Sequence, residues 1–188
     1  QLPELPMQRF ARYQAHSGLP VDDARQLAGE RALGDYYDAA AGLLPSEQHK
    51  PLANWLLSEL LARLGKDGVE IGACPMPPAH LAELVALVAD GTISGKIGKD
   101  IFDGCYRDGT SPRAVVEAKG LRQISDRSQL LELARAIIAD NPKPAAEFRA
   151  GKANMLGFFV GQMMKRTGGK AHPAMTSEIF AQLLADGG

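Results

Sequence analysis

Apolar residues recur with helical spacing through nearly the whole chain, and glycine or proline signals interrupt each run. The clearest run lies between Pro78 and Asp90, where one face of a helix carries Leu81, Leu84, Val85 and Val88 at the i, i+3, i+4, i+7 positions. No run shows the polar–apolar alternation of a half-buried strand convincingly. The sequence therefore predicts an all-α fold built from short helices.

Caps and breaks give the expected bounds of these helices. One helix is expected from about Pro51 to just before Gly65, and residues 64–78, rich in glycine and proline, are expected to form a loop. Gly91 is expected to end the next helix in the left-handed conformation. Ser111-Pro112 reads as a cap followed by a first-turn proline.

The chain is predicted to contain two domains. Residues 1–120 form the larger helical domain, and the composition changes near residues 119–123. Ser125-Asp126 then caps a new helix, and the two prolines after Asn141 break it and start another. Residues 121–188 are expected to form a small three-helix tail bundle. A bundle of this size is marginal by itself, so it is expected to lean on the first domain.

Composition excludes several classes of protein. Of 188 residues, 45% are hydrophobic and 23% charged, which is ordinary for a globular chain and excludes wholesale disorder. The net charge of −1 predicts neither a nucleic-acid binder, of DNA or of RNA, nor a membrane binder, so any electrostatic attraction must be local. No apolar stretch approaches the roughly 20 residues of a membrane span. Cys74 and Cys105 fit no zinc or redox motif, which favours reduced thiols in a cytoplasmic protein.

No catalytic constellation is recognisable. The four histidines are scattered without metal-like spacing, and there is no Walker loop or dinucleotide fingerprint. Residues 92–96 read TISGK but lack the spacing of a phosphate loop and follow a helix instead of a strand. We therefore expect no catalytic residue, no metal site and no cofactor in this chain.

The most informative segment is residues 148–177, which contain no aspartate or glutamate. The cationic residues of this segment are Arg149, Lys152, Lys165, Arg166 and Lys170. Such a local positive surface suits the phosphates that dominate affinity for nucleic acid. By charge alone, a solvated basic face without a partner fits equally well.

Helical geometry favours the nucleic-acid interpretation. If residues 152–166 form one helix, the buried stripe is Leu156, Phe159, Val160 and Met163. Gly157 and Gly161 then lie on the opposite side, flanked by Phe158 and Lys165. Two glycines inside a helix cost about 1 kcal/mol each against alanine, so the open strip is expected to have a use. It could receive a packed helix or a sugar–phosphate backbone, with Phe158 against a base or ribose.

The basic loop after this helix also favours the nucleic-acid interpretation. It reads KRTGGK over residues 165–170, and its glycines would let backbone N–H groups face outward. An exposed basic loop beside a glycine-faced helix modestly favours RNA over simple helix packing.

Several of these motifs resemble the GatB family, one of the subunits of the bacterial aspartyl/glutamyl-tRNA(Asn/Gln) amidotransferase. Residues 150–173 read AGKANMLGFFVGQMMKRTGGKAHP, which closely resembles the tail motif of that family, and residues 90–99 (DGTISGKIGK) resemble its second signature. The pairs Asn54-Trp55 and Tyr36-Tyr37 and the opening residues 2–6 (LPELP) are similar to further family segments. The resemblance covers essentially the whole chain, in the same order.

The resemblance implies a role in translation. The family corrects misacylated Glu-tRNA(Gln) and Asp-tRNA(Asn) as part of a glutamine-hydrolysing ligase, and its partners are an amidase subunit that frees ammonia and a small third subunit. An N-terminal domain of GatB proteins uses ATP and magnesium, and their helical and tail domains hold the tRNA. That catalytic domain has no counterpart here, so none of its residues is carried over. The absence of an initiator methionine suggests a fragment of a longer chain.

The matching positions define a predicted tRNA-binding surface. Carried over residue by residue, it consists of Lys152, Gly157, Phe158, Gly161, Gln162, Lys165, Arg166, Gly169 and Lys170. Ser94, Gly95 and Lys96 match the second signature, and they either contact tRNA or only fix a turn. The chain departs from the family pattern at Gly98, Phe159 and His172, none of which removes a basic contact.

Three alternatives stay open at this point. The chain could be a helical protein-interaction module that packs against partner subunits without touching RNA. It could be a free-standing protein like the YqeY family, which shares the helical and tail module, although the LPELP opening reads as the continuation of an upstream domain. An enzyme acting alone fits least well, because no group of residues could hold and polarise a substrate.

Overall fold

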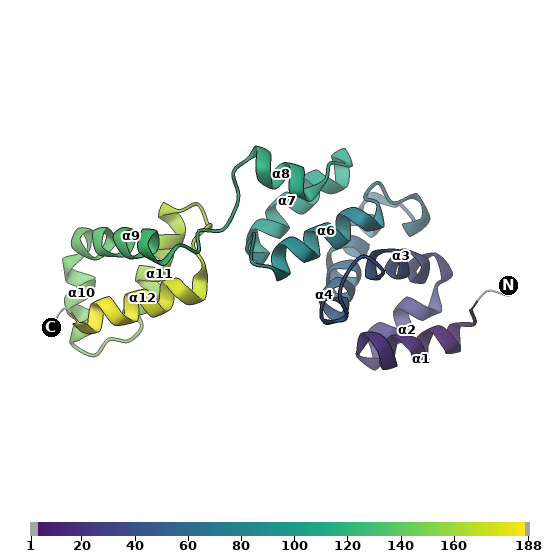
Figure 1. The fold of residues 1–188 in the computed structure, drawn as a ribbon, viewed down its shortest axis with the longest axis horizontal. Helices are drawn as coiled ribbons and strands as arrows, with labels where there is room; N and C mark the ends of the chain where they lie inside the picture. Colours follow the sequence, from purple (N-terminus) through teal and green to yellow (C-terminus); the bar gives the residue numbers. More distant parts are fainter. Residues whose placement is uncertain (1–3, 187–188) are drawn as a thin grey trace. The chain divides into compact units, whose positions relative to one another are not determined.

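A computed structural model describes residues 4–186, and helices joined by short turns make up nearly all of it (Figure 1). Within this described part the only strand-like pairing is a single bridge between Ile124 and Ala171. The all-α prediction is therefore confirmed. The Leu2-Pro3 part of the LPELP motif lies outside the described residues.

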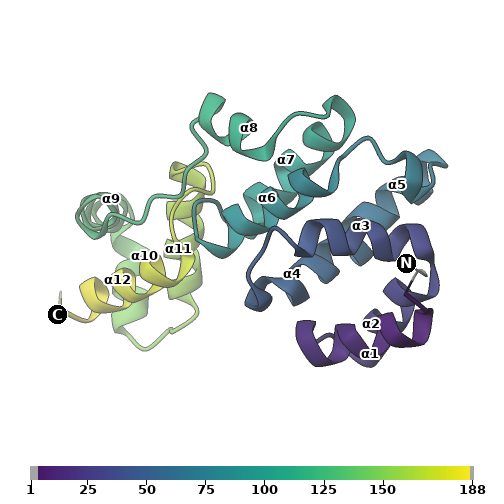
Figure 2. The same ribbon diagram turned by 45° about the vertical axis from the view of Figure 1, so that its right-hand side comes forward.

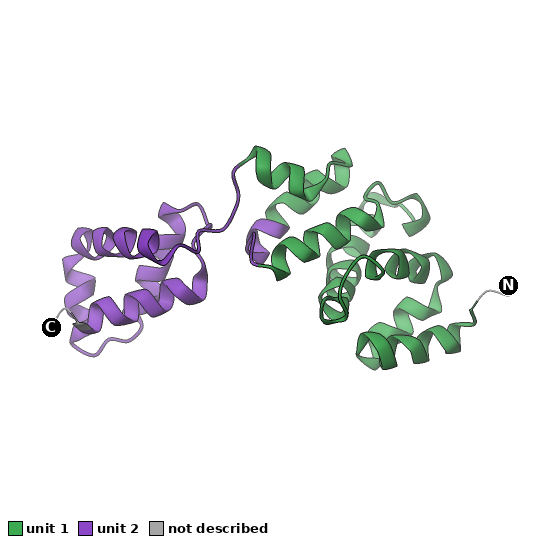
Figure 3. Ribbon diagram, viewed as in Figure 1, with its two compact units in different colours: residues 1–90, 99–119 green, residues 91–98, 120–188 purple. Residues whose placement is uncertain are grey.

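Contacts divide the chain into two compact units (Figure 3). The first contains residues 1–90 and 99–119, and the second contains residues 91–98 and 120–188. Residues 91–98 belong with the second unit, where the backbone N–H of Gln123 donates to the carbonyl of Thr92 at 2.7 Å. The predicted boundary at residue 120, and the expectation that the tail bundle leans on the first domain, stay predictions.

The first unit is a succession of short helices. Its α-helices are α1 (Pro6–Ser17), α2 (Val21–Gly29), α3 (Arg31–Ala41), α4 (His49–Asn54), α5 (Leu61–Asp67), α6 (Pro78–Ala89), most of α7 (Gly95–Asp108) and α8 (Pro112–Ala118). Short 3-10 turns lie at Ser46–Gln48 and Ile71–Ala73. Several predicted caps are present: Gly91 has φ +75°, and the Ser111 side chain accepts from the N–H of Ala114 ahead of Pro112.

One predicted helix end is wrong. A π-helical turn, Trp55–Leu60, joins α4 to α5, so the helical run continues through Gly65 to Asp67. It ends at Gly68, whose φ of +66° gives the left-handed cap. The expected 64–78 loop is correspondingly shorter.

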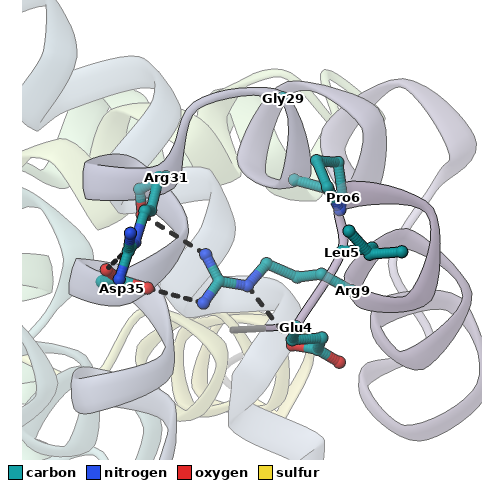
Figure 4. A pocket seen from close by; sticks show the side chains of 8 residues that line it. Glu4, Leu5, Pro6, Arg9, Gly29, Arg31 and Asp35 are labelled. Atoms are coloured by element: carbon teal, nitrogen blue, oxygen red, sulfur yellow. Dashed lines mark hydrogen bonds and ion pairs between the residues drawn. The ribbon is translucent and has the colours of Figure 1, made fainter. Parts of the chain in front are cut away.

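Ion pairs fasten α1 to α3. Arg9 donates to Asp35 at 2.5 Å, and Arg12 lies between Asp38 at 2.9 Å and Glu4 at 2.7 Å. Figure 4 shows the Arg9 guanidinium reaching across to Asp35, with Glu4 beside it. The hydrogen bond from Arg12 lowers the pKa of the Glu4 carboxyl from its usual value. This network holds the first helices together.

The second unit contains four helices in its described part, which corrects the predicted three. They are α9 (Arg127–Asp140), α10 (Pro142–Arg149), α11 (Met155–Arg166) and α12 (Pro173–Asp186). The break and restart at Pro142 were expected; the helix that was not expected is α12, which begins at Pro173, because proline favours the first position of a helix. Asp126 caps α9 as predicted, accepting from the N–H groups of Ser128 and Gln129.

A single apolar core joins these four helices, whose ribbons Figure 2 shows gathered in one bundle. Its central aromatic contact is between Phe159 of α11 and Phe180 of α12, with ring centroids 5.4 Å apart. Leu130, Ala134 and Ile137 of α9 complete the core with Met163 of α11, and all are buried. The core therefore fixes which side of α11 faces inward.

We predict that Gly34→Ala lowers the free energy of unfolding by about 1–3 kcal/mol. A Cβ at Gly34, in α3, would meet the Arg9 guanidinium and lie 2.9 Å from the carbonyl oxygen of Leu27. Urea denaturation followed by circular dichroism measures the change. The matched control is Gly104→Ala in α7, where a Cβ meets nothing within 4 Å and helix propensity predicts a gain of up to about 1 kcal/mol. Equal effects of the two substitutions would contradict the packing explanation.

Candidate nucleic-acid interface

Helix α11 has one buried and one open face. Phe159 and Met163 are fully buried in the core, where α11 packs against α9, α10 and α12. Gly157, Gly161 and Lys165 follow each other at four-residue intervals on the other side, and all three are exposed. The two glycines and the lysine therefore form one continuous solvent-facing strip, which we call the glycine face.

Nothing within the described part of the second unit fills the glycine face. A Cβ built on Gly157 or on Gly161 meets no atom within 4 Å. Close packing inside this unit therefore does not explain the two glycines, which lower helix stability by about 1 kcal/mol each. That a ligand or partner uses the flat surface stays a prediction.

The residues beside the glycine face are less open than the sequence suggested. Phe158 is half-buried against the tail core and lies edge-on to Phe159, with ring centroids 5.4 Å apart. Only part of its ring is therefore available for a base or ribose. Gln162 is half-buried and makes no side-chain hydrogen bond with any residue between 4 and 186.

The basic loop differs from the expectation that its N–H groups point outward. The N–H of Gly169 donates to the carbonyl of Met164 at 2.8 Å, and that of Gly168 to Lys165 at 3.4 Å. Both glycines have positive φ, +60° for Gly168 and +80° for Gly169, and Gly169 is buried. They end α11 by capping its last carbonyls, because those carbonyls have no partner further along the helix. Gly169 thus positions the loop and does not face solvent.

Lys152 lies outside α11, which begins at Met155 and not at residue 152 as expected. Its backbone N–H donates to Glu147 and so helps to end α10, and Gly151 turns the chain there with φ +96°. Its ammonium pairs with the Glu147 carboxylate at 3.2 Å. Lys152 and Lys165 therefore lie at opposite ends of α11, which rises about 15 Å between Met155 and Lys165.

The cations at the C-terminal end of α11 differ in their pairing. Lys165 is exposed and Lys170 half-buried, and neither ammonium forms an ion pair with any residue of the described part. Arg166 donates to the Asp140 carboxylate at 3.1 Å. No carboxylate of the described part therefore competes with an external anion for the ammonium groups of Lys165 and Lys170.

A polar groove of about 470 Å³ lies beside these cations, where the ends of α9 and α11 meet the start of α10. Its lining residues are Ile137, Asp140, Asn141, Gln162, Lys165 and Arg166, and we call it the α9–α11 groove. Sequence reasoning missed Asp140 and Asn141. The break at Pro142 marks a helix junction, but nothing local indicates that Asp140 meets a residue 26 positions away.

The second predicted signature begins α7. Ser94 accepts from the N–H of Ile97 at 3.2 Å with its side chain, while Gly95 and Lys96 are exposed. The adjoining Thr92 bonds to Gln123, and the next residue, Ile124, donates to the carbonyl of Lys170 at 2.7 Å. Two consecutive residues thus connect this turn to the basic loop. The cap role of Ser94 fits a turn-fixing function, and contact of the turn with tRNA stays a prediction.

Other possible sites were considered among the described residues. No three histidine, cysteine or acidic side chains lie together as metal ligands there. Both ring nitrogens of His49 are hydrogen-bonded, Nδ1 with the Ser17 hydroxyl at 3.0 Å and Nε2 with the carbonyl of Ala41 at 3.1 Å. His49 therefore has a structural role. No described helix is both long and apolar enough to cross a bilayer.

Comparison with known proteins decides the family. The profile of the GatB domain matches residues 35–184, which is most of the chain. The chain belongs to the GatB family. This assignment confirms the resemblance seen in the tail and second-signature motifs.

Curated GatB relatives are similar along nearly the whole chain. The GatB protein of the aspartyl/glutamyl-tRNA(Asn/Gln) amidotransferase from Synechocystis sp. is 46% identical over 98% of this chain, and its counterpart of the same name from Persephonella marina is 39% identical over 97%. The chain covers 37% and 38% of these two relatives, so it spans little more than a third of their length.

We predict opposite effects of alanine at two tail glycines. Gly169→Ala should destabilise the chain by about 1–2 kcal/mol, because an alanine is strained at φ +80°. Gly157→Ala should stabilise it by up to about 1 kcal/mol, because its Cβ enters open space on a helix. Thermal melts of both variants measure the difference. A destabilised Gly157→Ala would show that the glycine face is covered in the free chain.

Proposed function

We propose that this GatB-family chain binds tRNA for a tRNA-dependent amidotransferase that forms Gln-tRNA(Gln), Asn-tRNA(Asn) or both in translation. The observation that carries the proposal is the open glycine face of α11 beside Lys165 and Lys170, two cations without an ion pair in the described part. The names of the relatives support the choice of tRNA over other nucleic acids.

The physical basis is recognition of a backbone. Side chains cannot reach the base edges in the deep, narrow major groove of A-form RNA. A protein therefore recognises such RNA by its shape and through phosphate contacts. Exposed glycines let a sugar–phosphate backbone approach the helix closely, and the lysines supply charge at the end of the strip. Phe158 would add an edge contact with a ribose or base through the exposed part of its ring.

The remaining activity belongs to the proposed parent protein. There, an N-terminal domain would use ATP and magnesium to activate the carboxylate attached to tRNA. An amidase subunit would supply ammonia, and a small third subunit would complete the cytoplasmic assembly. In this proposal the present chain holds the tRNA and contributes no catalytic residue.

A protein-interaction module is the second candidate, favoured by the same open glycine pair. A helix of a partner protein could pack closely on Gly157 and Gly161, and the lysines would then only be solvated. Titrating the purified amidase partner against the chain, with and without tRNA, separates the two functions. Amidase binding that depends on the glycine face, without any RNA binding, would favour this candidate.

We predict that the double substitution Lys165→Ala and Lys170→Ala weakens tRNA binding and flattens its salt dependence. Each lost phosphate contact should reduce the slope of log K against log salt by about 1, so the pair should reduce it by about 2. Fluorescence anisotropy with labelled tRNA at several salt concentrations measures both quantities.

The matched control removes the same charge from the first unit, with Lys50→Ala and Lys66→Ala. Both lysines are exposed and neither has an ion pair among the described residues. The control should keep most of the affinity and slope. Unchanged affinity and slope in the Lys165/Lys170 variant would remove the proposed docking face.

A further inference from the structure

The α9–α11 groove is an unusual partner for a phosphate backbone because it contains a carboxylate. Lys165 and Arg166 attract anions, yet Asp140 lies on the same wall and pairs with Arg166 at 3.1 Å. A site that served only to attract phosphate would gain by losing Asp140. With Asp140 present, the groove suits a ligand that offers a hydrogen-bond donor as well as an anion.

The acceptor capacity of the groove is largely unused. A carboxylate has about four lone-pair positions, and Asp140 accepts one side-chain hydrogen bond, from Arg166. The Asn141 side chain donates through Nδ2 to the carbonyl of Ile137 at 2.8 Å, which leaves its oxygen as an acceptor. The amide of Gln162, free of side-chain hydrogen bonds in the described part, adds a donor and an acceptor.

The ion pair in the groove can exchange partners at little cost. The Asp140 and Arg166 side chains are 65% and 47% exposed, and pairs as exposed as this contribute little to stability. Arg166 can therefore turn to a phosphate, which leaves the Asp140 carboxylate ready to accept from a hydroxyl or amino group. Ile137, almost completely buried, provides an apolar floor between them.

We infer that the α9–α11 groove binds one unpaired ribonucleotide, with its phosphate on Lys165 and Arg166 and its ribose 2′-hydroxyl donating to Asp140. The inference rests on the proposed function and deepens it. Lys165 belongs to both the groove and the glycine face, so a backbone lying along α11 would bring a nucleotide to the groove at the end of the helix. The 2′-hydroxyl distinguishes RNA from DNA at such a site.

The test compares two labelled single strands that differ only in the 2′-hydroxyl, oligouridylate and oligodeoxyuridylate. Anisotropy titrations of the full 188-residue chain at low salt should show a preference for oligouridylate of roughly ten-fold, as expected for a hydrogen bond to a charged group. Asp140→Ala should abolish the preference by weakening oligouridylate binding, while oligodeoxyuridylate binds equally well or more tightly.

A control separates the acceptor role from a general change in charge. Glu178 on α12 forms an exposed ion pair with Arg127 at 2.9 Å and does not line the groove. Glu178→Ala removes the same charge and should strengthen binding of both strands slightly, with the preference retained. Far-ultraviolet circular dichroism of both variants verifies the fold.

The possible failures are distinguishable. If the chain binds tRNA but binds both strands equally, the ribonucleotide site is wrong and the proposed function stands. The same conclusion follows if Asp140→Ala strengthens the binding of both strands and the preference for oligouridylate remains. If the chain binds neither tRNA nor oligouridylate, the proposed function fails and this site fails with it.

Discussion

Burial of Phe159 and Met163 decides what the second unit presents to its surroundings. Because these side chains fill the core with Phe180 of α12, α11 cannot rotate without exposing them. The helix is therefore held with Gly157 and Gly161 toward solvent. The orientation of the outward surface is therefore a consequence of the inward packing.

The lysines and arginines around α11 in the second unit differ in whether they form an ion pair. Lys152 and Arg166 each have an acidic neighbour, while Lys165 and Lys170 do not pair in the described part. A chain with a net charge of −1 can in this way carry a local cationic surface at one end of one helix. Asp140 lies next to that surface, so the groove combines attraction of an anion with an acceptor for a donor group.

Much of the fold could be predicted because helix ends are encoded locally. Asp126 and Ser111 cap their helices through their own side chains, and Gly91 ends a helix by its backbone conformation. One helix end was predicted wrongly. The helix was expected to end before Gly65, but it continues through the π-helical turn and past Gly65 to the left-handed cap at Gly68.

The only part of the candidate site that could be predicted from the sequence was the part on a helix, where the helical repeat fixes which residues share a face. Phe159, Met163, Gly157 and Gly161 were assigned to the correct sides of α11 from spacing alone. The half-burial of Phe158 was missed, because the edge of a buried stripe depends on how closely the neighbouring helices approach. The direction of the N–H groups in the basic loop was predicted wrongly, because these groups donate to the last carbonyls of α11, which have no partner within the helix.

By itself, the sequence determined the all-α class, the family, several helix caps and the faces of α11. These follow from local spacing, caps and motifs, for which neighbours along the chain are enough. Only the tertiary structure decided that Asp140 pairs with Arg166, that residues 123 and 124 join the 91–96 turn to the basic loop, and that a polar groove forms between α9 and α11. Those contacts join residues about 25 to 50 positions apart, and they exist because the apolar core brings the helices together.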